Sequence, residues 1–186
     1  KTLILSPEAI ERNKDLKIVY TPIHGTGIKL IPDALRAYGF TNIIDVPEQN
    51  VISGNFPTVV SPNPEEPAAL EMAVNKARET DADIVMASDP DADRIGIAIK
   101  NDKNEWILVN GNQTYLILIY YLIRRWKELG RLKGNEYVVK TIVTTEVMTD
   151  IARKNGVEYF DCFTGFKWIA AVMRDNEGKK TYIGGG

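Results

Sequence analysis

The stretch that decides the fold is Ala82-Asp-Ile-Val-Met-Ala-Ser-Asp-Pro-Asp-Ala-Asp-Arg-Ile-Gly-Ile-Ala-Ile99, in which two apolar runs enclose an acidic one. The flanking runs, residues 82–87 and 95–99, are short and apolar, which predicts two strands. Residues 88–94, the acidic loop, are predicted to connect them. Because open α/β sheets bind ligands beyond the carboxyl ends of their strands, this loop is the first candidate for a functional site.

Asp89, Asp91 and Asp93 alternate along the acidic loop, and alternate side chains project to the same side. Converging carboxylates repel one another, so the spacing favours a hard divalent cation with oxygen ligands, Mg²⁺. Arg94 follows directly, and a guanidinium beside a metal ion is typical of phosphoryl transfer, because both neutralise the moving group. The alternative is an acidic surface turn with Arg94 in a surface ion pair. A calcium EF-hand is excluded, since Arg94 and Lys100 occupy the positions of its glycine and glutamate.

Strands and helices alternate along the chain, which argues for two α/β units with mostly parallel or mixed sheets. Each unit is expected to have three layers, α/β/α, one over residues 1–110 and the other over residues 111–186. The proline-rich residues 47–67 predict an ordered but irregular connection. The remaining predicted strands are 16–20, 42–46, 106–109, 137–143, 157–160 and 181–183, and the predicted helices are 28–38, 67–80, 113–129, 145–155 and 166–174.

Composition argues against several classes of protein. The formal net charge is −2, from 23 basic and 25 acidic residues, so broad binding to nucleic acid or to an anionic membrane is not expected. Cys162 is the single cysteine, which rules out an internal disulfide and fits a cytoplasmic location. The longest apolar run, residues 115–123, is too short to cross a bilayer. The glycines at 184–186 predict a loop, so the chain is expected to be a fragment.

Within the acidic loop, Asp89-Pro-Asp-Ala-Asp-Arg94 resembles the metal loop of the α-D-phosphohexomutases, the phosphoglucomutase/phosphomannomutase superfamily. The resemblance covers essentially the whole chain and corresponds to the family's second domain and most of its third. The nearest branch is that of the long phosphoglucomutases, including phosphopentomutase-like members. Further segments resemble the family in the same order, namely Thr21-Pro-Ile-His-Gly-Thr-Gly27, Phe56-Pro-Thr-Val59, Pro62-Asn-Pro-Glu-Glu66, Gly111-Asn-Gln-Thr114, Thr164-Gly-Phe-Lys-Trp168 and the start of a sugar-selecting loop at 184–186.

The resemblance implies a Mg²⁺-dependent isomerase, an intramolecular phosphotransferase of carbohydrate metabolism. A phosphoserine in the first domain would move phosphate between C1 and C6 of a hexose, or C5 of a pentose, through a bisphosphate intermediate. Asp89, Asp91 and Asp93 would bind Mg²⁺, and Arg94 would be the catalytic residue beside the transferring phosphate. The phosphoserine loop and the family's domains I and IV have no counterpart in this sequence, so the chain alone is expected to be inactive. The alternative from a different class is a non-catalytic sugar-phosphate or metal-binding module.

Two further sets of residues are candidates. His24 lies in a glycine turn after the first strand, and it is expected either at the cleft, contacting a phosphate or the first domain, or hydrogen-bonded to its own turn. Thr164, Gly165 and Lys167 would contact the substrate, because the family's Thr-Gly turn faces the sugar site. The alternative for Thr164 is that it caps the following helix.

Overall fold

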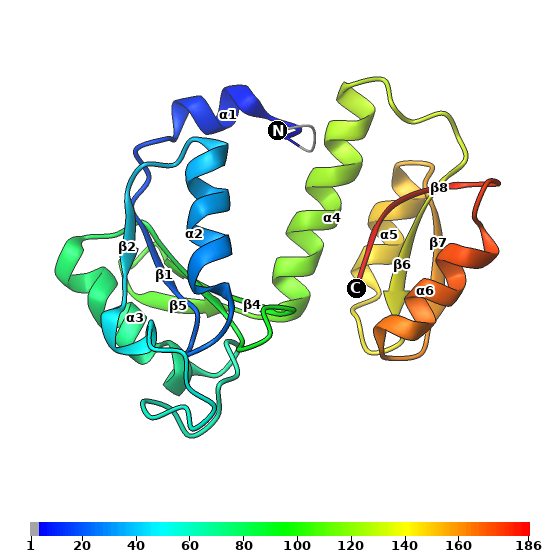
Figure 1. Ribbon diagram of the computed structural model, residues 1–186. Helices are drawn as coiled ribbons and strands as arrows, with labels where there is room; N and C mark the ends of the chain where they lie inside the picture. Colours follow the sequence, from blue (N-terminus) through cyan, green and yellow to red (C-terminus); the bar gives the residue numbers. More distant parts are fainter. Residues whose placement is uncertain (1–3) are drawn as a thin grey trace. The chain divides into compact units, whose positions relative to one another are not determined.

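The computed structural model describes residues 4–186 and divides them into two compact units, with the division between Gly111 and Asn112. Each unit is an α/β domain around its own sheet (Figure 1). The α/β class and the mixed and parallel sheets predicted from the sequence are confirmed. Within residues 4–186, none of the helices combines the length and the apolar character that a bilayer-spanning segment needs.

The sheet of the first unit has five strands in the order β2-β1-β3-β4-β5. Strands β2, β1 and β3 run parallel, and β4 and β5 each pair antiparallel with the preceding strand. The acidic loop therefore connects an antiparallel pair at the carboxyl end of β3. The elements are α1 (Pro7–Arg12), β1 (Ile18–Thr21), α2 (Gly27–Tyr38), β2 (Ile43–Asp45), the 3₁₀ helix η1 (Pro47–Gln49), α3 (Pro67–Thr80), β3 (Ile84–Ser88), β4 (Ile95–Lys100) and β5 (Trp106–Val109).

Different helices cover the two faces of this sheet. Val19, Val85 and Ala98 lie side by side on neighbouring strands and pack in one buried cluster with α3. Helix α3 contributes alanines at four-residue spacing, and these small side chains let the helix lie close to the strands. Tyr20, the next residue of β1, points to the opposite face, because successive strand residues alternate. There Gly27 of α2 lies so close that an added Cβ would be 2.4 Å from the Tyr20 hydroxyl.

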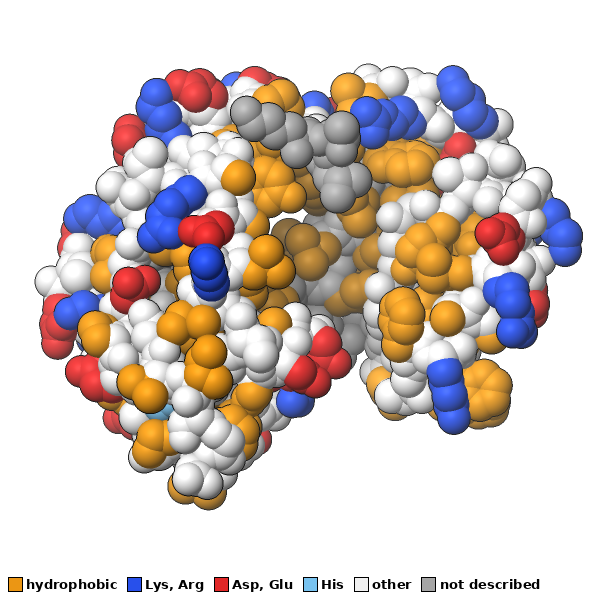
Figure 2. Space-filling model, in the orientation of Figure 1, with side chains coloured by type: hydrophobic (Ala, Val, Ile, Leu, Met, Phe, Trp, Pro, Cys, Tyr) orange, Lys and Arg blue, Asp and Glu red, His pale blue; other side chains and the backbone are white. Residues whose placement is uncertain are grey.

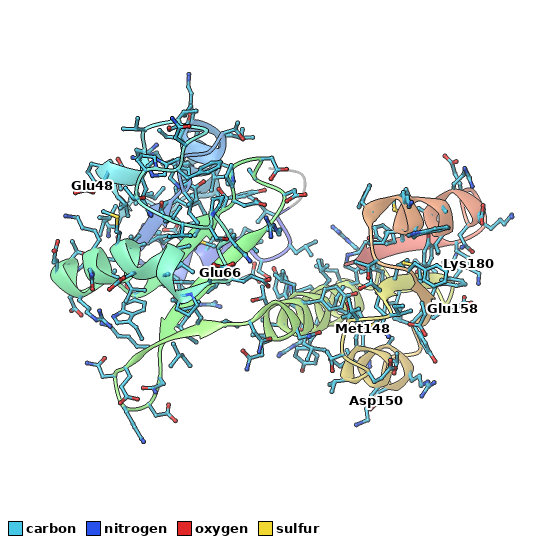
Figure 3. All side chains as sticks on the ribbon, turned by 90° about the horizontal axis from the view of Figure 1, so that it is seen from below. Glu48, Glu66, Met148, Asp150, Glu158 and Lys180 are labelled. Carbon is cyan, nitrogen blue, oxygen red and sulfur yellow. The ribbon has the colours of Figure 1, made fainter. Side chains whose placement is uncertain are left out.

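The second unit is built on three parallel strands in the order β7-β6-β8. The whole of the central strand β6 is buried. On one face Val138 packs with α4 and α5, including the fully buried Met148 (Figure 3). On the other face Tyr137 and Val139 pack with Ile169 of α6. The elements are α4 (Gly111–Glu128), β6 (Glu136–Thr141), α5 (Val147–Lys154), β7 (Glu158–Cys162), α6 (Phe166–Asp175) and β8 (Thr181–Gly185).

The two units share one strand order. In each, the first strand is central, the second lies on one side of it and the third on the other, as β2-β1-β3 and as β7-β6-β8. In each, a helix connects the first strand to the second, and another helix precedes the third. No repeat is evident in the sequence, so the likeness between the units exists in topology alone.

The structure differs from the sequence predictions mainly at short elements. Helix α1 and the 3₁₀ helix η1 were not predicted, because α1 has no buried residue and neither is long enough to show apolar periodicity. Helix α4 begins at Gly111, before the predicted start at residue 113. Strand β5, predicted over residues 106–109, pairs antiparallel with β4.

Candidate metal centre

The acidic loop brings three carboxylates together at the carboxyl end of β3. Asp89, Asp91 and Asp93 each offer an oxygen, and these oxygens lie within 4.8 Å of one another. The predicted convergence is present, but a tight turn produces it rather than strand-like alternation. The backbone N–H of Ala92 donates to the carbonyl of Asp89 at 3.0 Å, and Ala92 has a φ of 62°. Across residues 4–186, no other cluster of three or more such side chains is close enough to hold a metal ion.

Asp89 is the buried member of this cluster, and Arg94 neutralises it. Its Oδ1 accepts the backbone N–H of Arg94 at 2.9 Å, and its Oδ2 accepts the Arg94 Nε–H at 2.7 Å. Burial by itself would raise the pKa of Asp89, but the hydrogen bonds from Arg94 outweigh it and lower that pKa below its ordinary value. Asp89 is therefore a carboxylate at neutral pH.

The two other carboxylates are exposed to solvent and repel one another. A hydrogen bond to Asp89, together with the charges of Asp89 and Asp91, raises the pKa of Asp93. Crowded carboxylates and an all-oxygen donor set with open positions fit a hard divalent cation such as Mg²⁺. Arg94 remains charged beside them, and its side chain is 53% exposed, so its guanidinium can reach an anion from solvent.

A cavity of about 260 Å³ lies beside this loop in the first unit. Asp93 and Arg94 form its charged side, and Tyr20 lies on its α2 side. The Tyr20 hydroxyl is 2.8 Å from the hydroxyl of Ser88, the last residue of β3, and this contact is buried. The loop thus follows a strand end that is joined to β1 by a buried hydrogen bond, and it borders this small cavity.

His24 lies inside the first unit, where its side chain is only 1% exposed. Its Nδ1 is 2.7 Å from the carbonyl oxygen of Val51, and its Nε2 is 2.8 Å from the Thr58 hydroxyl. The structure therefore does not place His24 at a cleft surface. The other interpretation also needs correction, because the ring binds the proline-rich connection instead of its own turn.

Thr164 and Gly165 lie in an exposed turn before α6, and the exposed Lys167 lies in the first turn of that helix, in the second unit. Gly165, with a φ of 117°, occupies the N-cap position, and no side chain caps the helix. The N-cap interpretation of Thr164 is therefore wrong, and its hydroxyl is exposed. The Nζ of Lys167 lies 5.2 Å from the ring centroid of Trp168. The structure thus brings together the four predicted residues of the acidic loop, Asp89, Asp91, Asp93 and Arg94, in the first unit. The other three predicted residues, at 164, 165 and 167, belong to the second unit.

Lys140 is a buried charged residue that the sequence analysis did not single out. Its Nζ lies 2.8 Å from a carboxylate oxygen of Glu146 and 3.1 Å from one of Asp161. The signal was available, because a lysine interrupts the apolar strand predicted at residues 137–143. A buried lysine in such a strand requires acidic partners, but the sequence does not show which residues they are.

Basic side chains form no continuous stripe on the face shown in Figure 2, where they are scattered among acidic ones. A protein that follows a nucleic-acid backbone usually gathers Lys and Arg on one face or along one helix. This face has no such arrangement.

Comparison with protein families gives two adjoining matches. Residues 4–103 match the model for the α/β/α domain II of phosphoglucomutase/phosphomannomutase, and residues 110–186 match the model for its domain III. A probable phosphoribomutase of Schizosaccharomyces pombe is 36% identical over 172 residues, covering 92% of this chain and 29% of the relative. A phosphoglucomutase of Staphylococcus saprophyticus is 36% identical over 163 residues, covering 88% and 29%.

Solved structures show the same fold. A phosphoglucomutase/phosphomannomutase family protein of Burkholderia thailandensis is similar with a TM-score of 0.70 and 21% identity, covering 92% of this chain and 36% of that one. An N-acetylphosphoglucosamine mutase of Aspergillus fumigatus, in complex with GlcNAc-6P and magnesium, has a TM-score of 0.62 and 18% identity, covering 91% and 36%. The chain spans about 30% of the length of the curated relatives it matches.

Proposed function

The chain belongs to the phosphoglucomutase/phosphomannomutase family, and on this basis we propose that it is the metal-carrying middle of a Mg²⁺-dependent phosphohexomutase. The parent enzyme is an isomerase that moves phosphate between C1 and C6 of a hexose, or C5 of a pentose. It does so through a phosphoserine and a bisphosphate intermediate. Residues 1–110 act as its second domain and residues 111–186 as most of its third.

The observation that carries this proposal is the cluster at the end of β3. Three carboxylates lie within 4.8 Å of one another, and a charged, half-exposed arginine is joined to the buried one. The exposed Asp91 and Asp93 carboxylates lie beside the buried one and repel it, and a bound divalent cation would relieve that repulsion. The arrangement matches the requirements of phosphoryl transfer, which depends on positive charge placed around the moving group.

Each residue of the site has a role in this proposal. Asp89, Asp91 and Asp93 hold Mg²⁺, and Arg94 binds a phosphate oxygen pair through its planar guanidinium. Bound Mg²⁺ would supply positive charge that stabilises the phosphoryl group during transfer. In the second unit, the exposed Thr164–Lys167 turn binds the sugar phosphate, with backbone N–H groups at the start of α6 available to an anion.

The substrate is a hexose or pentose phosphate. Relatives named phosphoglucomutase and phosphoribomutase are equally similar to this chain, at 36% identity each. The chain alone is inactive in this proposal, because no serine of the sequence lies in a loop like the family's phosphoserine loop. Its partners are the parent's domains I and IV, and the parent works in the cytoplasm, as suits an enzyme of sugar phosphates.

The test compares two aspartate variants in the longer protein that contains this chain. Conversion of glucose 1-phosphate to glucose 6-phosphate is measured with Mg²⁺ and with a chelator. Asp91→Asn should lower turnover by about 100-fold or more, because it removes a ligand of the Mg²⁺ whose positive charge stabilises the transferring phosphoryl group. Asp102→Asn, a matched change in the exposed turn between β4 and β5, should have no effect. A longer protein that binds Mg²⁺ through this loop but has no turnover on hexose or pentose phosphates would instead be the binding module.

A further inference from the structure

A glycine turn from a distant part of the chain supports the acidic loop at its centre. Thr26 donates two hydrogen bonds to the carbonyl oxygen of Pro90, from its backbone N–H at 2.8 Å and from its hydroxyl at 3.0 Å. Pro90 lies between the first two carboxylates of the cluster, and Thr26 is 64 positions earlier in the sequence. The path of the acidic loop is therefore fixed from outside the loop.

The glycines of this supporting turn, residues 24–27, lie in direct contact with the residues on both sides of Asp89. A Cβ added to Gly25 would lie 2.3 Å from the Cα of Pro90 and 2.6 Å from its carbonyl oxygen. A Cβ added to Gly27 would lie 2.6 Å from the hydroxyl oxygen of Ser88. Because backbone atoms make the first of these contacts, a larger residue at position 25 could be accommodated only by moving the loop.

His24 holds the supporting turn in place from the other side. Besides its two ring contacts, its backbone N–H donates to the carbonyl of Gln49 at 2.9 Å, and its own carbonyl accepts the N–H of Ser53 at 3.1 Å. The residue has a φ of 62°, a conformation that L residues adopt only where surrounding bonds hold it. The turn is thus a fixed part of the first unit, joined to the proline-rich connection.

We propose that the supporting turn positions the metal centre, and that Thr26 is the positioning residue through which it sets the spacing of the three carboxylates. The inference rests on the proposed function, because it concerns affinity for the cation of the same site. Three mutually repelling carboxylates on a free loop would move apart, and the affinity for a cation would fall. Two hydrogen bonds and a backbone contact at Pro90 keep them close, so less ordering is needed when a cation binds.

The probe is Mn²⁺, titrated into the full chain and followed by the electron paramagnetic resonance signal of the free ion. Thr26→Val removes one hydrogen bond and keeps the side-chain shape, so it should weaken Mn²⁺ binding by about fivefold. Thr26→Ser keeps the hydroxyl and should bind as the unchanged chain does. Gly25→Ala should weaken binding by more than about tenfold, because its Cβ displaces Pro90. Gly54→Ala is the matched control, since nothing lies within 4 Å of its added Cβ.

Urea unfolding of the same variants separates positioning from stability. If Thr26→Val and Gly25→Ala lower the urea midpoint but bind Mn²⁺ like the unchanged chain, the turn is only structural and the inference is overturned. The variant Asp91→Asn tests whether the metal assignment in the proposed function is itself wrong. If it binds Mn²⁺ as tightly as the unchanged chain does, the metal assignment in the proposed function is wrong, and the inference falls with it. Loss of binding in Asp91→Asn but not in Thr26→Val overturns the positioning role alone.

Discussion

Replacing Lys140 by methionine should leave the stability of the second unit almost unchanged, although the lysine is buried and ion-paired. Its side chain is 1% exposed, and its Nζ contacts Glu146, Asp161 and, at 3.4 Å, the carbonyl of Thr144. Methionine keeps an unbranched apolar chain of similar length and removes only the ammonium. The change therefore separates the charge from the packing.

The expected magnitude follows from the exposure of the partners. Burial of an ammonium costs several kcal/mol, which attraction to the carboxylates roughly offsets. The Glu146 side chain is 76% exposed and that of Asp161 is 47% exposed, so both carboxylates become hydrated once the lysine is gone. No buried charge is left without a partner, and Lys140→Met should change the unfolding free energy by no more than about 1 kcal/mol in either direction.

Two contrasting variants make the reasoning testable. Lys140→Ala also deletes the buried stem and should destabilise by about 2 kcal/mol or more through the cavity that it leaves. The double variant Glu146→Gln with Asp161→Asn removes both carboxylates and leaves the ammonium buried, so it should be more damaging than Lys140→Met. It should also lower the pKa of Lys140, which its hydrogen bond to the Glu146 carboxylate and the nearby charge of Asp161 now raise against the effect of burial.

The assay is urea unfolding followed by circular dichroism at pH 7. Because the folded-state pKa of Lys140 is raised, its charged form contributes fully below the ordinary value of 10.5, and that contribution is lost only as pH rises through the folded value. Results at pH 7 and pH 9 should therefore agree. A loss above about 3 kcal/mol for Lys140→Met would refute the reasoning, because it would mean that the carboxylates are left buried and uncompensated.

Three further outcomes are expected. Glu136→Gln should destabilise the second unit in urea by about 1–3 kcal/mol, since the buried Glu136 carboxylate accepts two backbone N–H groups of the preceding turn. These bonds outweigh burial and lower the pKa of Glu136, so its contribution is present above its ordinary pKa and is lost as pH falls through the folded value. Gly96→Ala should destabilise the first unit by about 1–3 kcal/mol, because its Cβ would lie 2.0 Å from the carbonyl oxygen of Pro64, while Gly54→Ala should change the midpoint little. Burial raises the pKa of the Cys162 thiol, so iodoacetamide should alkylate the chain slowly when folded and quickly in urea; equal rates would show that the thiol is accessible.

The sequence predicted those helices and strands whose boundaries are marked by residues within the element or next to it. The apolar runs of β3 and β4 and the glycines that follow α2 and α4, Gly39 and Gly130, are local signals, and they located these elements within a few residues. The family resemblance is confirmed by the two family matches. It could be read from the sequence because Asp89 to Arg94 is a contiguous motif. The order of the strands in the two sheets could not be predicted from local sequence signals, since it depends on pairing between segments far apart in the chain.

The parts of the site that escaped sequence analysis depend on distant partners. The ring of His24 binds residues 27 and 34 positions away, so neither interpretation drawn from its own turn was right. Thr26 acts on a carbonyl 64 positions away, and only the fold reveals the contact. Lys140 was visible as a charge in an apolar strand, but its meaning depends on the exposure of Glu146 and Asp161.

The parallel pairing of β1 with β3 also sets the order in which the metal centre can mature as the chain folds. Strands β3 and β4 are neighbours in sequence, so their hairpin needs little loop closure, whereas β1 must close a loop of more than 60 residues to reach β3. The supporting turn follows β1 and arrives with it. A nascent or partly folded chain thus carries its aspartates on a hairpin without the contact at Pro90. In the proposed metal centre, cation binding is therefore expected late in refolding, and the appearance of Mn²⁺ binding would time the docking of β1.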